Sequence, residues 1–198
     1  MIAIAATQNK NKIEEMRAIT ECYGFQIYSM NDAGFREINV EEDGKTLEEN
    51  SLKKAMEIHR ISGMITIADD SGLMVDALNG APGVQSARFA GEDGNDEKNI
   101  EKLLKLLGDL PWEERKAKFA TVITMVFSEK TVLVARGECK GHILYDMQGD
   151  NGFGYDPIFV PDGYKQSFGQ LGAVVKNKIS HRAKALQNLK NLLEGIHE

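Results

Sequence analysis

Short apolar runs alternate along this chain with segments whose apolar residues recur at helical spacing, and this alternation constrains the fold most. Periods of two and of 3.6 residues predict strands and amphipathic helices respectively. Strands are predicted at residues 2–6, 25–29, 64–68, 73–78, 118–127 and 131–143. Helices are predicted around Ile13, Met16 and Ile19, and over residues 46–62, 95–109 and 180–196. Two hairpins, one at Asn79-Gly80 and one at residues 128–130, favour an α/β fold with a mixed twisted sheet.

Local signals mark the ends and buried faces of these helices. Thr46 and Glu49 form a capping-box pattern, and Ser180 is placed to cap the last helix. The apolar face of the helix over 46–62 is expected to be Leu47, Leu52, Ala55 and Met56. That of the helix over 95–109 is expected to be Ile100, Leu103, Leu104 and Leu107.

Length and charge narrow the class of protein. A chain of 198 residues predicts one domain, residues 1–198, or two closely joined lobes. A net charge of −6 argues against nucleic-acid and acidic-membrane partners, which require a basic surface. The absence of a long apolar run or signal peptide predicts a cytoplasmic protein without a membrane span. Cys22 and Cys139 form no CxxC motif and are expected to be reduced core residues.

Acidic residues stand at two places where they need an explanation. Asp69 and Asp70 follow the apolar run at 64–68, where two buried carboxylates repel each other unless a metal ion or turn amides hold them. Glu41 and Glu42 lie in an acidic loop, which is usually a solvated turn. A hard divalent cation would bind such a carboxylate if a second one approached it.

Cationic and aromatic residues occupy two further stretches. The loop "ATQNKNKIEE" opens a helix after the first strand and offers backbone N–H groups to an anion, although Asn9 could simply cap that helix. His181 and Arg182 follow the Ser180 cap, with Lys176 one turn earlier. Phe153 and Tyr155 stand among glycines, which suits stacking on a planar ligand as well as folding back onto the core. Together these features indicate a magnesium–nucleoside triphosphate site.

Five motifs in this order resemble the inosine/xanthosine triphosphate pyrophosphatases over nearly the whole chain. They are "ATQNKNKIEE", "EEDGKTLEENSLKKA", "ADDSGLMVDALNGAPGVQSARFAG", "GFGYDPIFVPDGY" and "KNKISHRAKAL". The resemblance implies two lobes around a central nucleotide-binding cleft and Mg²⁺-dependent hydrolysis of ITP, dITP and XTP to the monophosphate and pyrophosphate. It also implies a homodimer.

The resemblance also implies a role for each matching residue. Asp70 would be the general base and, with Glu41, a magnesium ligand, Glu42 being the alternative to Glu41. The substrate would be bound by Thr7, Gln8, Asn9, Lys10, Asn11, Lys12, Ser71, Phe153, Gly154, Tyr155, Asp156, Lys176, His181 and Arg182. Among these, Lys176 would reach phosphate, while His181 and Arg182 would recognise the base.

One departure and two alternatives accompany this interpretation. Gln170 stands where the family commonly has glutamate, close to the Lys176 motif. A related pyrophosphatase for another modified nucleotide, or a nucleotide-binding module without catalysis, would share most of these motifs.

Overall fold

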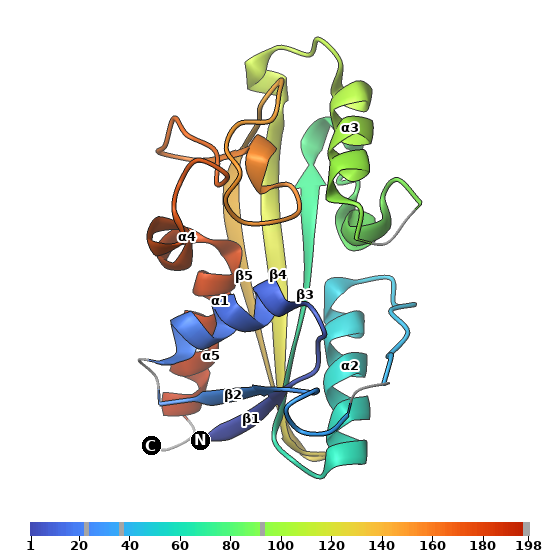
Figure 1. Cartoon of the computed structure of the whole chain (residues 1–198), viewed down its shortest axis with the longest axis vertical. Coiled ribbons are helices and arrows are strands. Elements are labelled where there is room, and N and C mark those ends of the chain that lie inside the picture. The colour runs from blue at the N-terminus through green and yellow to red at the C-terminus, as the bar shows by residue number, and fades with distance from the viewer. Residues whose placement is uncertain (22–23, 36–37, 92–93, 196–198) are drawn as a thin grey trace. The chain divides into compact units, whose positions relative to one another are not determined.

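The computed structural model describes residues 1–21, 24–35, 38–91 and 94–195, and its strands form one six-stranded mixed sheet (Figure 1). The strand order is β2-β1-β3-β4-β5-β6. The strands are β1 Ile2–Ala5, β2 Gln26–Ser29, β3 Thr66–Val75, β4 Lys116–Ser128, β5 Thr131–Ile143 and β6 Phe159–Pro161. The helices are α1 Lys10–Thr20, α2 Leu47–Ser62, α3 Asp96–Leu107, α4 Ala173–Ile179 and α5 His181–Glu194.

The sheet is mixed because it combines parallel and antiparallel pairs. Strand β1 runs parallel to β2 and to β3, with Ile4 opposite Thr66. Strand β6 runs antiparallel to β5, with His142 opposite Val160. The predicted α/β fold with a mixed sheet is therefore confirmed.

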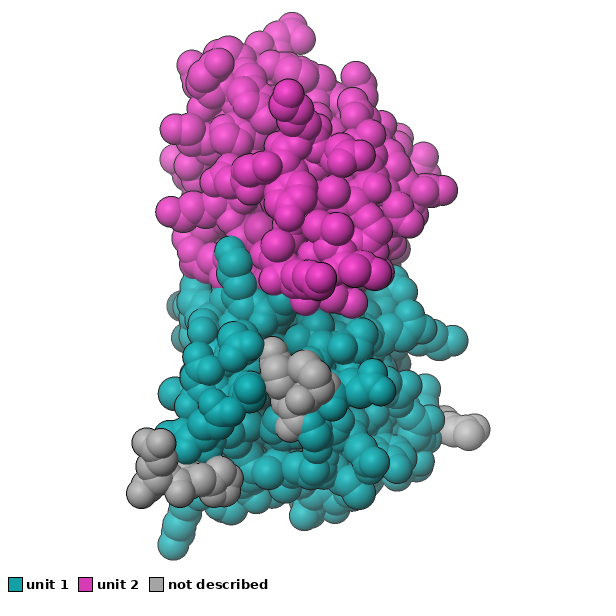
Figure 2. Space-filling model, turned by 90° about the vertical axis from the view of Figure 1, so that its left-hand side faces the viewer, with its two compact units in different colours: residues 1–70, 121–137, 182–198 teal, residues 71–120, 138–181 magenta. Residues whose placement is uncertain are grey.

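The chain divides into two compact units, which Figure 2 shows in different colours. Unit 1 comprises residues 1–70, 121–137 and 182–198, and unit 2 comprises residues 71–120 and 138–181. The divisions fall inside β3, β4 and β5, and after His181, the first residue of α5.

Unit 1 has a core on each face of its sheet. One core joins Ile67 of β3 to apolar residues of α1 and α5, and the other joins Ala68 to Ala55 and Ile58 of α2. Successive side chains of a strand point to opposite faces, so neighbouring residues of β3 meet different helices.

The described apolar residues of unit 2 form one core. Three residues of α3, Ile100, Leu103 and Leu107, pack there with Phe119 of β4 and other apolar side chains. Leu104 lies against the same core and is partly buried. The predicted inner face of this helix is confirmed.

Strand β3 differs from its prediction. Two strands, at residues 64–68 and 73–78, were expected, with an Asn79-Gly80 hairpin turn after the second. Instead, one strand runs from Thr66 to Val75, through both aspartates. Asn79 and Gly80 do form a turn with positive φ angles of 53° and 84°. The turn follows a short 3₁₀ segment, Asp76–Leu78, and leads only to an isolated bridge between Met74 and Pro82. The hairpin prediction was wrong because the residues of a turn do not determine whether the segment after the turn pairs with the strand before it.

Helix α2 begins as predicted, and its buried face includes the predicted Leu47 and Ala55 but not Leu52. Thr46 accepts from the Glu49 N–H, which confirms the N-cap. Its buried residues are Leu47, Asn50, Ser51, Lys54, Ala55 and Ile58, whereas Leu52 is 41% exposed. The prediction of Leu52 as a core residue was wrong, since three polar residues occupy the stripe that packs against β3.

Further predictions concern the remaining strands and helices, the cysteines and membrane spans. Strands β4 and β5 and helix α5 lie where predicted, while α4, just before Ser180, was not anticipated. Cys139 is buried as a reduced cysteine, and Cys22 lies outside the described residues. Within residues 1–21, 24–35, 38–91 and 94–195, no helix combines the length and apolarity needed to span a bilayer.

Candidate active site

Asp69 and Asp70 point to opposite faces of β3, which separates their charges without a turn. Asp69 follows the alternation of Ile67 and meets α1 and α5, whereas Asp70 follows Ala68 and meets α2. Both aspartates are buried, with exposures of 0% and 5%. Because β3 continues through both aspartates, the pleat of the strand rather than a turn sets their carboxylates apart.

Asp69 lies between two cations. Its Oδ2 is 3.3 Å from Lys12 Nζ and 2.8 Å from Arg182 Nη2. Burial alone would raise the pKa of Asp69, but the Lys12 ammonium and the Arg182 guanidinium hold that pKa well below its ordinary value. Asp69 is therefore ionised at neutral pH and lies between its two cationic partners.

Arg182 is held by two carboxylates from different parts of unit 1. Its Nη1 donates to Glu15 of α1, and its Nη2 donates to Asp69 of β3. Although burial opposes the charged form, these carboxylates raise the pKa of Arg182. Glu15 was not anticipated as a site residue, although it stands one helical turn after the predicted Lys12 and Asn11.

The pKa of Asp70 is shifted in the opposite direction to that of Asp69. Burial raises its pKa above the ordinary value, and the Glu42 carboxylate acts in the same direction, while Lys54 and Asn50 oppose the rise. Asn50 Nδ2 donates to Asp70 Oδ2 at 3.0 Å, and Lys54 Nζ lies 3.8 Å from Asp70 Oδ1. A carboxylate with a raised pKa is a stronger base than a solvated one.

Lys54 joins the acidic loop to the strand that carries Asp70. Its Nζ lies 2.8 Å from Glu42 Oε1 and donates to the main-chain oxygen of Asp69 at 2.7 Å. Although burial opposes its charged form, the carboxylates of Asp70, Asp69 and Glu42 raise the pKa of Lys54. Asn50 and Lys54 were missed at the sequence level, and their signal was the presence of polar residues on an otherwise apolar helix face.

The carboxylates beside Lys54 fit a hard divalent cation. Glu42 and Asp70 already share one cationic group, and their oxygens are the donors that Mg²⁺ prefers. Glu41 is exposed. Among the described residues, no three His, Cys, Asp or Glu side chains gather as a metal cluster. One or two carboxylates completed by substrate phosphates is the usual protein contribution to a magnesium site.

The loop after β1 is ordered by its own side chains. Asn9 Oδ1 accepts from Lys12 N–H and caps α1, while Thr7 Oγ1 accepts from Asn9 N–H. Gln8 Nε2 donates to the Ile38 carbonyl. Burial lowers the pKa of Lys12, an effect that Asp69 opposes.

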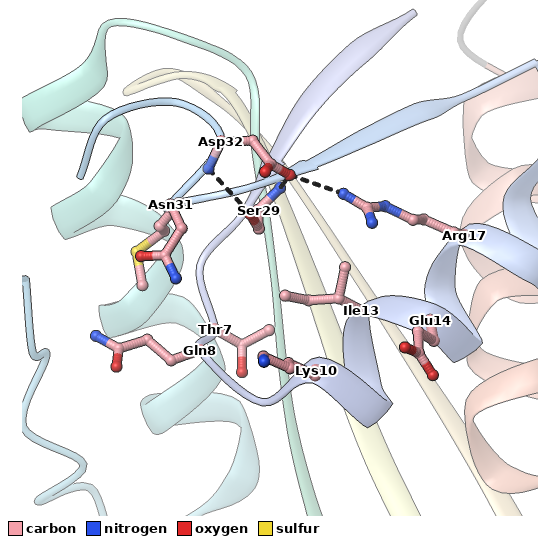
Figure 3. A pocket seen from close by; sticks show the side chains of 10 residues that line it. Thr7, Gln8, Lys10, Ile13, Glu14, Arg17, Ser29, Asn31 and Asp32 are labelled. Carbon is pink, nitrogen blue, oxygen red and sulfur yellow. Dashed lines mark hydrogen bonds and ion pairs between the residues drawn. The ribbon is translucent and has the colours of Figure 1, made fainter. Parts of the chain in front are cut away.

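Lys10 and Lys12 lie on different flanks of α1. Lys12 points to Asp69, whereas Thr7, Gln8 and Lys10 line a cavity of about 260 Å³ at the carboxyl ends of β1 and β2 (Figure 3). The figure shows Arg17 reaching Asp32 across the far side of this cavity, where their ion pair measures 3.0 Å. The predicted phosphate loop therefore presents its two lysines in two directions.

In unit 2, Lys176 and Asp156 form a buried ion pair. Lys176 Nζ lies 2.6 Å from Asp156 Oδ2 and 4.6 Å from the centre of the Phe153 ring. Asp156 Oδ2 also accepts from Phe153 N–H at 2.9 Å. Three predicted substrate-binding residues, Phe153, Asp156 and Lys176, are thus in mutual contact.

Tyr155 and His181 are buried in unit 2. The Tyr155 hydroxyl donates to the Ser86 carbonyl at 2.9 Å, and its ring belongs to the unit 2 core. The His181 ring stacks on Phe119 with centroids 4.7 Å apart. Tyr155 therefore folds back onto the core, the alternative that the sequence left open.

Two further predicted substrate-binding residues also lie in unit 2. Gly154 N–H donates to Asp96, and Ser71 is half-buried on β3.

The side chain of Gln170 accepts a main-chain hydrogen bond that a glutamate at this position could also accept. Its Oε1 accepts from Ser167 N–H at 3.0 Å, and a carboxylate oxygen could accept the same bond. This departure from the family pattern leaves the local turn intact.

The fold and the site define an α/β protein in which a buried aspartate of the central strand β3, Asp69, forms ion pairs with Lys12 and Arg182. Residues 3–192 match the Ham1 family, and the chain belongs to that family. It is 49% identical to a dITP/XTP pyrophosphatase of Clostridium perfringens, over 98% of this chain and 97% of that protein. It is 51% identical to one of Thermoanaerobacter pseudethanolicus over the whole of both.

Solved structures show the same fold. The Staphylococcus aureus Ham1 protein is 39% identical with a TM-score of 0.86, covering 98% of this chain and 99% of that one. A nucleoside-triphosphatase / dITP/XTP pyrophosphatase from Mycobacterium abscessus is 41% identical with a TM-score of 0.76, covering 96% and 98%.

Proposed function

We propose that this protein hydrolyses non-standard purine nucleoside triphosphates, namely dITP, XTP and ITP, to the monophosphate and pyrophosphate. Relatives at 49% and 51% identity over nearly the whole chain are named dITP/XTP pyrophosphatases. The observation that carries the proposal is Asp70, a buried carboxylate of raised pKa beside Lys54 and Glu42. A phosphate-binding module without catalysis would have no use for a buried base there.

Asp70 acts as the general base that takes a proton from the attacking water. The Asn50 amide orients its carboxylate, and the buried position keeps bulk water from competing for the proton. Lys54 compensates the negative charge that gathers as phosphate approaches Glu42 and Asp70. The reaction breaks the bond between the α-phosphorus and its bridging oxygen, water supplies the new P–O bond, and pyrophosphate leaves.

Glu42 and Asp70 are the proposed Mg²⁺ ligands, which selects Glu42 from the two glutamates that the sequence left open. Bound magnesium would neutralise phosphate charge and make a coordinated water more acidic. Glu42 is preferred over Glu41 because its Oε1 shares Lys54 with Asp70.

The remaining substrate contacts follow the sequence-level prediction except for the role of Lys176. The triphosphate is assigned to the loop from Thr7 to Lys12, and Ser71 is assigned to substrate. The base and sugar are assigned to Phe153, Gly154, Tyr155, Asp156, Lys176, His181 and Arg182. This assignment moves Lys176 from phosphate to the base, because Asp156 and Phe153 hold its ammonium.

Arg182 provides a physical basis for base choice. Hypoxanthine and xanthine carry a 6-keto acceptor, while adenine carries a 6-amino donor. Arginine can only donate, so adenine would place donor against donor. Reading the base requires one guanidinium nitrogen of Arg182 to exchange Glu15 for substrate.

Pyrophosphate release from dITP, XTP, ITP, GTP and ATP with Mg²⁺ tests the function. We expect turnover of the first three, with ³¹P NMR showing pyrophosphate rather than inorganic phosphate. Asp70→Asn should abolish turnover, and Asp76→Asn, at an exposed position following β3, should leave it unchanged. Full activity of the Asp70 variant would refute its role as base, and tight ITP binding without hydrolysis by the unaltered protein would refute the enzyme.

A further inference from the structure

Asn50 uses both ends of its side-chain amide to join separate parts of unit 1. It is fully buried on α2, where its Nδ2 donates to Asp70 Oδ2 at 3.0 Å. Its Oδ1 accepts from the main-chain N–H of Gly44 at 2.8 Å. The orientation of the amide is dictated by its partners, because a main-chain N–H can only donate and a carboxylate can only accept.

Gly44 packs so closely against α2 that no other residue fits without displacement. A Cβ at this position would lie 2.5 Å from Asn50 Oδ1 and 2.9 Å from Glu49 Cβ. The φ angle of Gly44 is not in the left-handed region, so close approach rather than backbone strain requires the glycine. The contact brings the acidic loop, residues 41–44, up to the helix that carries Lys54.

The main chain of β3 beside Asp70 is held without Asn50. Thr121 Oγ1 donates to the Asp70 carbonyl at 3.0 Å, Lys54 Nζ to that of Asp69, and Ser51 Oγ to that of Ala68 at 3.2 Å. Three successive carbonyls are thus each fixed by a side chain. Asn50 therefore controls the direction of the Asp70 carboxylate rather than the course of the strand.

We propose that Asn50 is a positioning residue, which ties the acidic loop at Gly44 to the Asp70 carboxylate so that Glu42 and Asp70 face phosphate together. The inference rests on the proposed function for its effect on catalysis. Partners of this kind, which orient groups that touch substrate or metal, change activity by about 10–100-fold when removed.

The two hydrogen bonds of the Asn50 side chain, to Gly44 and to Asp70, are called the Asn50 clamp below. Two variants distinguish loss of this clamp from general destabilisation of the fold. Asn50→Ala removes both hydrogen bonds, whereas Gly44→Ala pushes the loop away through the Cβ contact and leaves Asn50 and Asp70 unaltered. The matched controls are in unit 2. Asn99→Ala removes a buried asparagine that holds Ala87 and Ala90, and Gly172→Ala adds a Cβ in open space.

Hydrogen exchange at the residue 44 amide and steady-state kinetics give independent measurements. We expect that amide to exchange about tenfold faster in both clamp variants, as for loss of one hydrogen bond. With ITP, kcat should fall by about 10–100-fold while KM changes by less than about threefold. The controls should change neither quantity. Thermal melts identify folded variants, and Gly44→Ala carries the test if Asn50→Ala does not fold.

Unchanged exchange at residue 44 in a folded Asn50→Ala protein would overturn the clamp. Faster exchange with unchanged kcat would overturn the positioning role. If the unaltered protein releases no pyrophosphate from any nucleotide, the proposed function fails, while exchange at residue 44 still decides whether the clamp exists.

Discussion

Replacing Asp69 by asparagine should destabilise the protein strongly, because it leaves buried cations without their counter-ion. Asp69 is 0% exposed, and its Oδ2 lies 3.3 Å from Lys12 Nζ and 2.8 Å from Arg182 Nη2. Removing one partner of a buried ion pair costs about 3–5 kcal/mol. Since Arg182 keeps Glu15, we expect a loss near the lower end, about 3 kcal/mol.

Asp70→Asn is the matched control, since it makes the same chemical change at the next position of the same strand. Burial raises the pKa of Asp70, so its ionised form costs more free energy in the folded protein than in the unfolded chain. A neutral amide removes that penalty, and Lys54 keeps Glu42. We therefore expect Asp70→Asn to leave stability unchanged or increased.

Urea unfolding near neutral pH measures both variants. With a slope of about 2 kcal/mol/M, a loss of about 3 kcal/mol lowers the midpoint by about 1.5 M. Because the pKa of folded Asp69 is depressed, its contribution is present above the unfolded value of about 4 and declines as pH falls below it. The gap between the Asp69 variant and the unaltered protein should narrow over that acidic range. Equal midpoints for the two variants would refute the assignment of Asp69 and Asp70 to opposite environments.

Three further outcomes are expected. Arg115→Leu should lower stability by about 3 kcal/mol, because this buried guanidinium donates to three main-chain carbonyls and lies 4.3 Å over Tyr145; a urea midpoint equal to that of the unaltered protein would contradict this. Lys54→Met should reduce kcat for ITP by at least about tenfold by removing the cation that Glu42 and Asp70 share, and unchanged kinetics would exclude Lys54 from the site. Arg182→Ala should weaken the preference for ITP over ATP, measured as the ratio of kcat/KM values, and an unchanged ratio would remove Arg182 from base recognition.

The sequence predicted most helices and strands because their signals are local. Ile13, Met16 and Ile19 are buried at the spacing that placed α1, and the Thr46 cap is made within the same turn that revealed it. The Asn79-Gly80 hairpin failed for the complementary reason. A turn depends on a few residues, whereas the strand on its far side depends on distant partners.

The residues of the candidate site were also proposed from the sequence. Acidic residues beside the third strand, lysines after the first strand and aromatic residues among glycines stand in family order. Asn50 and Lys54 escaped notice because helical spacing shows which side chains share a face but not what that face meets. Only packing against β3 showed that these polar residues are buried beside Asp70.

The sequence by itself determined the order of the elements and the set of charged groups available, since both depend on neighbours in the chain. Tertiary structure decided which charges meet. Arg182 and Asp69 are 113 residues apart, yet they form a buried ion pair. The two adjacent aspartates acquire opposite pKa shifts because the pleat of β3 sends one toward cations and the other toward a buried, partly acidic surrounding.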